Sequence, residues 1–171
     1  MGIEEMFAGM DTAQGSSSGV FFTNGVYKVG LTEIEYRPNG YKGKSVFFRF
    51  KVLETNNPEH PVGSTRVWIC KLGKKPDDDK RTMADIKSLI FALTGTSAKD
   101  VGSPEQNPKM HQQATAAFLA ACDKTYAEKN NIEQDMLVGS ECALECQTIK
   151  TNPKPGQTEG GVFTRHIWSP S

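Results

Sequence analysis

The sequence predicts a mainly β fold, a five-stranded barrel with two helices inserted between the third and fourth strands. The first observation is residues 45–53, where every second side chain is apolar, which is the period of a half-buried strand. The second is that four other segments have strand composition and are bounded by turns rich in Gly, Pro and Asn. The third is residues 82–93, whose apolar side chains recur with helical spacing instead.

The strands are identified by their alternation. They are predicted at residues 25–37, 45–53, 65–72, 136–151 and 162–168. In the first strand the alternation slips at Gly30, and a glycine at such a slip indicates a bulge that lets one long strand serve two sheet surfaces. In the second strand four alternate residues are expected to face the core, namely Val46, Phe48, Phe50 and Val52.

The helices are predicted at residues 82–93 and 110–129. Thr82 is placed to cap the first helix, with Asp85 in the capping-box position. Its apolar stripe is expected to pack against the apolar face of residues 45–53 and consists of Ile86, Leu89, Ile90 and Leu93. The predicted order of elements is three strands, a helical segment and two strands. This is the order of an OB-type Greek-key barrel. An α+β sandwich of the same order, without closure, is the alternative architecture.

A chain of 171 residues is long enough for one well-buried domain and marginal for two. We therefore expect a single domain over residues 25–171, preceded by an arm of residues 1–24. The stretch at residues 13–19 has the Gly/Ser composition of a flexible linker. The apolar residues near the start of the arm have the spacing of a short amphipathic helix, but a frayed terminus is the favoured interpretation.

Charge is unevenly distributed along a chain whose formal net charge is zero. Residues 1–24 hold three acidic and no basic residues, a net charge of −3. Residues 25–75 hold ten basic and four acidic residues, a net charge of +6. A basic first half on a neutral protein is a local electrostatic footprint of the kind that attracts polyanions.

Motifs of enzymes and of metal sites are missing from the sequence. It contains no nucleotide-binding glycine loop, no HExxH and no GxSxG. Its four cysteines form no CxxC pair and its three histidines are scattered, so neither zinc nor a cofactor is expected. We interpret the protein as a non-enzyme with reduced cysteines, located in the cytoplasm, since neither a signal peptide nor a membrane span is apparent.

The second strand also carries the candidate binding residues. On the face opposite its apolar side lie Phe47, Arg49 and Lys51, which are an aromatic ring and two cations. A ring gives a base something to stack on and a cation neutralises a phosphate, which is how single strands are held. We expect Arg66 and Trp68 of the third strand to face outward beside them. The alternative is a half-exposed strand whose cations only keep it soluble.

Several segments, taken in order, carry a resemblance to a known family. They are residues 25–29, 47–53, 63–64, 93–95 and 160–163. With them the chain resembles phage-encoded single-stranded DNA-binding proteins of the OB-fold kind, over most of residues 25–168. The resemblance implies largely sequence-independent binding of single-stranded DNA in phage DNA replication or recombination, in the cytoplasm of the host cell.

This family holds single strands with rings and cations on strands two and three and with the loops that join strands one to two and four to five. Carried over to this sequence, the implied nucleic-acid-binding residues are Tyr41, Lys42, Lys44, Phe47, Arg49, Lys51, Arg66, Trp68, Lys150, Lys154, Arg165 and Trp168. Many members end in an acidic tail that recruits replication proteins, whereas this chain ends neutrally. Replication or recombination partners would then be absent or would use the acidic arm.

Two other functions fit the same pattern. An OB-like module could bind proteins instead, as a phage assembly or host-takeover factor, with the same strands as its interaction surface. An RNA-binding barrel is the third interpretation. In a different strand register, Phe47 and Trp68 would both lie in the core and not in a binding site.

Overall fold

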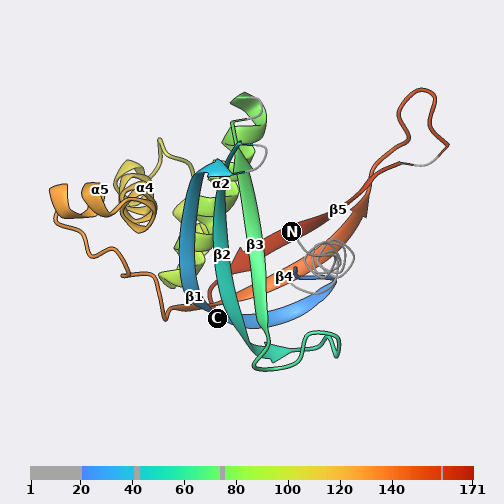
Figure 1. Cartoon of the computed structure of the whole chain (residues 1–171), viewed down its shortest axis with the longest axis horizontal. Coiled ribbons are helices and arrows are strands. Elements are labelled where there is room, and N and C mark those ends of the chain that lie inside the picture. Colours follow the sequence, from blue (N-terminus) through green and yellow to red (C-terminus); the bar gives the residue numbers. More distant parts are fainter. Residues whose placement is uncertain (1–20, 41–42, 74–75, 159) are drawn as a thin grey trace, which may run out of the picture.

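The computed structural model describes residues 21–40, 43–73, 76–158 and 160–171, and its centre is one five-stranded antiparallel sheet (Figure 1). The strands are β1 (Gly25–Gly40), β2 (Gly43–Thr55), β3 (Thr65–Leu72), β4 (Glu141–Lys150) and β5 (Val162–Ser169). Their order across the sheet is β3-β2-β1-β4-β5. The helices are α2 (Pro76–Leu93), α3 (Ala98–Val101), α4 (Pro108–Cys122) and α5 (Lys124–Lys129).

The sheet is open, so the expected closure into a barrel is wrong for the described residues. Strands β3 and β5 form its two edges and do not pair with each other. Phe21, just before β1, forms a single parallel bridge with Val67 at the free edge of β3. The ring of Phe22 packs edge-on against Phe50 of β2 and His166 of β5, at centroid distances of 5.9 and 6.4 Å. The segment before β1 therefore occupies space that β5 would need to reach β3.

Strand β1 is the one long strand that serves two surfaces. It pairs with β2 over most of its length, and with β4 over its first six residues. Val29 is thus flanked by Val52 on one side and Cys142 on the other. The pairing with β2 shifts register on both sides of Gly30, between Lys28 and Val29 and again after Leu31, which confirms the predicted irregularity.

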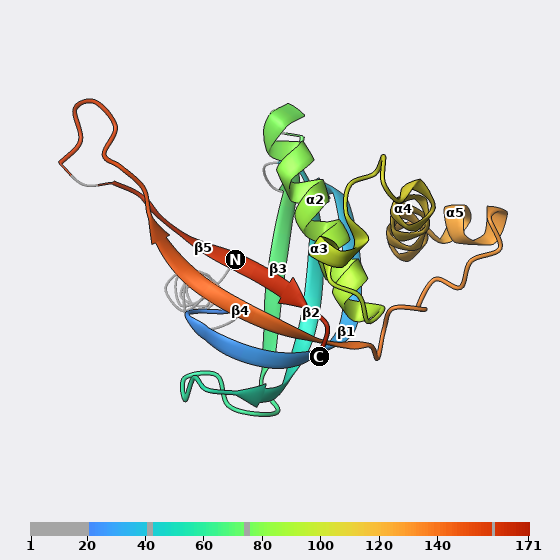
Figure 2. The same cartoon turned by 180° about the vertical axis from the view of Figure 1, so that it is seen from behind.

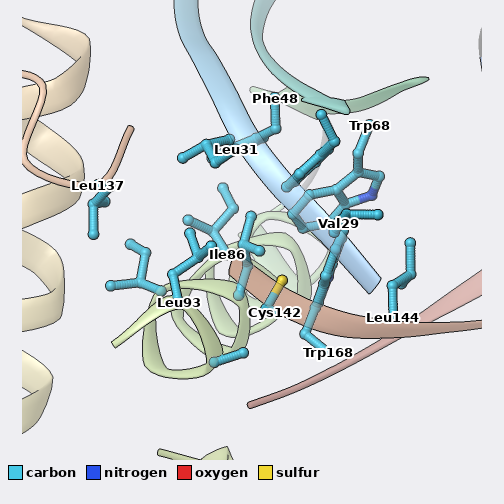
Figure 3. Packing of buried hydrophobic residues seen from close by; sticks show 14 of the residues in the cluster. Val29, Leu31, Phe48, Trp68, Ile86, Leu93, Leu137, Cys142, Leu144 and Trp168 are labelled. Atoms are coloured by element: carbon cyan, nitrogen blue, oxygen red, sulfur yellow. The ribbon is translucent and has the colours of Figure 1, made fainter. Parts of the chain in front are cut away.

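The core lies between the sheet and α2. All four predicted inward residues of β2 are fully buried, and the apolar stripe of α2 belongs to the same cluster. Figure 3 shows Ile86 and Leu93 of α2 gathered with Leu31 and Cys142 of the sheet. The helix crosses the sheet so that its contacts are with β3, β4 and β5. The sequence predicts packing on β2 alone, so the helix covers more of the core than expected.

The helical segments differ from the prediction at three points. Helix α2 begins at Pro76, six residues before Thr82, because proline suits the first helical position and Asp77 and Asp79 in the first turn match the helix dipole. The second predicted helix is divided at Asp123, whose carboxylate accepts a hydrogen bond from the Thr125 amide (2.9 Å) and so starts α5. The short helix α3 was not predicted. Figure 2 shows α4 and α5 beside α2, away from the β4–β5 hairpin.

The expected boundaries of the arm and of the fourth strand also move. Strand β4 begins at Glu141, because residues 136–140 turn back toward β1, where the Gly139 amide donates to the Leu31 carbonyl (2.8 Å). Residues 21–24 belong to the domain and not to the arm, since Phe22 is only 2% exposed. The rest of the predicted arm, residues 1–20, lies outside the described residues.

Candidate nucleic-acid interface

The side chains that β1, β2 and β3 direct away from the core form one surface, which we call the outer patch. Strand register decides its membership, because residues directly opposite each other in an antiparallel pair share a face. Phe47 lies opposite Glu35 of β1 and Ile69 of β3, while Arg49 lies opposite Glu33 and Val67. The outer patch consists of Glu33, Glu35, Arg37, Phe47, Arg49, Lys51, Val67, Ile69 and Lys71.

Arg66 and Trp68 do not belong to the outer patch, so their expected position beside Phe47 and Arg49 is wrong. They lie opposite Phe50 and Phe48 on the core face, where they are 8% and 9% exposed. The ring of Trp68 packs against Phe48 at a centroid distance of 5.2 Å. Phe47 in contrast faces outward, as predicted, and is half-buried.

Carboxylates already hold the two arginines of the outer patch. Arg49 Nη1 donates to Glu33 Oε2 (3.0 Å) and Glu35 Oε2 (2.9 Å), and Arg37 Nε donates to Glu35 Oε1 (2.8 Å). The hydrogen bond from Arg37 lowers the pKa of Glu35 most, and the one from Arg49 lowers it further. A phosphate approaching Arg49 must therefore compete with two carboxylates. Ion pairs this exposed stabilise the fold little, so the competition is modest.

Phe47 is flanked by the same arginines. The guanidinium carbon of Arg37 lies 4.2 Å from the centre of the ring and that of Arg49 lies 5.5 Å from it. Both distances are within the range of cation–π attraction. The ring and the two guanidinium planes together form a small stacking platform beside the aliphatic side chains of Val67 and Ile69.

Two lysines complete the outer patch. Within the described part of the chain, Lys51 and Lys71 form no ion pair and are exposed, so they are its most accessible cations. Lys44, a predicted site residue, is also exposed, but it lies opposite Leu72 in the alternation of Val46 and Phe48 and so does not share the outer face. Arg37 and Lys71 were not predicted as site residues. Both alternate with apolar residues on their strands, but only the register shows that they share a face with Phe47.

A cleft separates the free edges of β3 and β5, and we call it the seam cleft. Its volume is about 930 Å³. The edge of β3 contributes Val67, Trp68 and Ile69, and the opposite wall is formed mainly by residues 163–168 of β5. Polar side chains come from the helical side and comprise Asp85, Ser88, Ser97 and Lys99. Two of the predicted site residues on β5, Arg165 and Trp168, thus meet Trp68 in the seam cleft and not on the outer patch.

The wall of the seam cleft is aromatic. The ring of His166 lies 5.7 Å from Trp68 and stacks on Trp168 at 6.0 Å, while the two tryptophans are 5.1 Å apart. Trp168 is buried, and its indole Nε1–H has no hydrogen-bond partner within the described residues. Burial also raises the pKa of the Asp85 carboxyl, and the nearby Arg165 acts in the opposite direction.

The remaining predicted residues lie on the β4–β5 hairpin or outside the described chain. Beyond Cys146 strand β4 no longer pairs with β1, so the hairpin continues as a two-stranded ribbon that projects from the sheet (Figure 1). Lys150 and Lys154 are exposed on this ribbon. So is Phe163, which is 49% exposed and was not predicted as a site residue. Tyr41 and Lys42 lie outside the described residues.

Burial lowers the pKa of His166 to about 4, and burial likewise lowers that of His60. An unfolded histidine titrates near 6.5. Above that pH neither state binds the proton, but below it the unfolded state does and the folded state does not. We expect the free energy of unfolding to fall by about 2 kcal/mol for His166 between pH 6.5 and 5. Urea titrations at several pH values, with His166→Gln as the comparison, measure this loss, and an unchanged pH dependence in the variant would contradict it.

Within the described residues no three His, Cys, Asp or Glu side chains are grouped to hold a metal ion, and no helix is long and apolar enough to cross a membrane. Comparison with protein-family models finds no match, and searches of curated proteins and of solved structures also find none.

Proposed function

We propose that the protein binds single-stranded DNA on the outer patch, without catalysing a reaction and with little sequence preference. The observation that supports this most directly is the outer patch itself. It holds four basic and two acidic residues, a net charge of +2, on a protein that is neutral overall. An aromatic ring and two aliphatic side chains lie among these charges. Stacking platforms inside a basic groove are the usual means of holding single strands.

In this mechanism the lysines neutralise phosphates and the Phe47 platform stacks a base. Phosphates would be held by Lys51 and Lys71, while Arg49 would join them on exchanging a carboxylate for a phosphate. The path from Phe47 over Ile69 leads to the seam cleft and the cationic ribbon beyond it. The ribbon would then hold the strand at its far end, through Lys150, Lys154 and Arg165.

The architecture supports a finer fold proposal. An OB fold is a five-stranded, partly open Greek-key barrel whose second and third strands, with the loops after strands one and four, bind oligonucleotides. The strand order here places β1 between β2 and β4 and leaves an opening between β3 and β5. We assign the sheet to this class, with the seam cleft as the opening.

Binding of oligo-dT is expected to weaken by about 1–3 kcal/mol when Phe47 is replaced by alanine, because one stacked base is lost. Lys51→Gln is expected to reduce the slope of log K against log salt by about 0.7, since one fewer counterion is released on binding. Glu35→Gln is expected to strengthen binding, because it removes the carboxylate that pairs with Arg37 and leaves Arg49 paired with Glu33 alone. Fluorescence anisotropy with oligo-dT, duplex DNA and RNA at several salt concentrations measures all three effects.

The matched control is Lys124→Gln, which removes an equally exposed lysine on α5 whose Nζ lies 3.9 Å from Glu128. Its affinity and salt slope should equal those of the wild type. If Phe47→Ala and Lys51→Gln fold normally yet also bind as the wild type does, the outer patch is not the binding site. Stronger binding to RNA than to DNA would assign the same site to RNA.

The pairing of both arginines with glutamates favours a second candidate, an OB-like module that binds a protein. A surface whose guanidiniums are neutralised and which includes the half-buried side chains of Val67 and Ile69 also suits a protein partner. The salt series separates the two functions. Affinity for a polyanion falls steeply with salt, whereas affinity for an apolar protein surface does not.

A further inference from the structure

The free edges of β3 and β5 are the least protected part of the sheet. Edge strands present unpaired backbone groups and are usually covered by another element. In the described chain, β3 has only the single bridge from Phe21 to Val67 on its outer side, and no strand pairs with the outer side of β5. Aliphatic and aromatic side chains line the opening between them, including Ile69, Ile149 and Phe163. An apolar segment is suited to cover this cleft.

The chain itself enters the sheet through this cleft. Phe21, Phe22 and Thr23 all line it, and Phe22 is anchored against Tyr27 at a ring distance of 5.1 Å. The anchor is reinforced where the Thr23 hydroxyl lies 2.9 Å from Nε2 of the buried His60. The twenty residues that precede Phe21 are therefore attached at the mouth of the cleft.

The composition of residues 1–20 suits the cleft. Four of its apolar residues recur with helical spacing and would share one face, namely Ile3, Met6, Phe7 and Met10. Its charges are all negative and come from Glu4, Glu5 and Asp11. The rim of the cleft has two cations, Lys99 and Arg165, and one carboxylate, Asp85. The apolar face matches the lining, and the acids match the net positive rim.

The tether has a suitable length. About ten residues, mostly Gly, Ser and other small or polar types, separate Met10 from Phe21. A linker of this composition has a root-mean-square span of roughly 16–19 Å. Short linkers of this kind give an effective concentration in the millimolar range. Even a weak intrinsic affinity would then keep the cleft occupied.

We propose that residues 1–20 bind back into the seam cleft and cover the free edges of β3 and β5 in cis, with their apolar face on Ile69 and Phe163. Their acids lie toward Lys99 and Arg165. The seam cleft is then a docking site for a short acidic, apolar segment. The proposal goes beyond nucleic-acid binding and does not rest on it, although Val67 and Ile69 line the seam cleft and also belong to the outer patch.

Hydrogen exchange measured by mass spectrometry, without nucleic acid, tests the docking. Two variants remove the occupant: one lacks residues 1–20 and retains Phe21, and the other is full-length with Ile3, Phe7 and Met10 changed to Ser. In both, we expect amides of β3 and β5 to exchange at least tenfold faster, with those of β1 unchanged. A synthetic peptide of residues 1–20, added to the shortened protein, should restore protection saturably. Full-length Gln14→Ala, a change within the linker, is the matched control.

Equal exchange rates in the wild type and both variants would overturn the proposal, as would a uniform increase across all five strands. Protection that is lost when the wild-type protein is diluted would show that a second copy covers the cleft, which also overturns docking in cis. Two results together would exclude the apolar face as the docking element. The peptide would fail to restore protection in the shortened protein, and the triple-serine variant would exchange like the wild type.

Discussion

Replacing Trp68 by alanine is expected to lower the free energy of unfolding by about 3–5 kcal/mol, the usual cost of removing a large buried aromatic side chain. Its ring packs between Phe48 and Trp168, at 5.2 and 5.1 Å, and forms part of the wall of the seam cleft. The surrounding rings belong to two other strands, β2 and β5, and cannot all close on the vacated space. Urea denaturation followed by far-UV circular dichroism measures the loss without relying on tryptophan fluorescence.

Phe47→Ala is the matched comparison, because Phe47 is an aromatic residue on the adjacent strand that faces outward. It should unfold at nearly the wild-type urea concentration while losing affinity for oligo-dT. If Trp68→Ala is as stable as Phe47→Ala, the register that pairs Trp68 with Phe48 is wrong.

These two aromatic residues also show how far the sequence can predict a strand. Residues 45–53 have one face that is wholly apolar, so only one orientation buries it, and that orientation is confirmed. The third strand offers no such contrast. One face carries Arg66, Trp68 and Cys70, and the other carries Val67, Ile69 and Lys71, so both faces are mixed. Pairing with β2 decides between them, and pairing is a long-range property that alternation along one strand does not contain.

The same distinction applies to the candidate site. The alternation of side chains along β2 is enough to predict that Phe47 and Arg49 point outward together. The same alternation does not show that Glu33 and Glu35 hold Arg49, because those carboxylates belong to β1 and their register with β2 is set by a shift near Thr32. Local patterns thus predicted the residues of the outer patch on β2, whereas the state of its charges depends on strand pairing.

The open seam could not be predicted for a related reason. The order of strands and helices is that of a closed barrel, and closure depends on whether the two edge strands reach each other. Phe22 prevents this by packing between β2 and β5, yet in the sequence it follows a Gly/Ser-rich stretch that indicates a linker. The boundary of the domain lies before residue 21, because the ring of Phe22 is buried against strands that come much later in the chain.

Phe22→Ala is therefore expected to cost about 3–5 kcal/mol of stability, as a buried Phe does elsewhere. Its ring contacts Tyr27, Phe50 and His166, and the two residues that follow are fixed by hydrogen bonds, with Asn57 Nδ2 donating to Thr23 Oγ1 and to the Asn24 carbonyl, both at 3.0 Å. Thermal and urea unfolding of the full-length variant measure the loss.

Two truncations locate the boundary independently of the substitution. Removing residues 1–24 takes away the Phe22 anchor together with these hydrogen bonds, and should lower stability at least as much as Phe22→Ala does. Removing residues 1–20 retains them, and should leave most of the stability in place even if the seam cleft is uncovered. Equal unfolding midpoints for the two truncated proteins would mean that Phe22 does not hold the sheet, and that the domain begins at Gly25 after all.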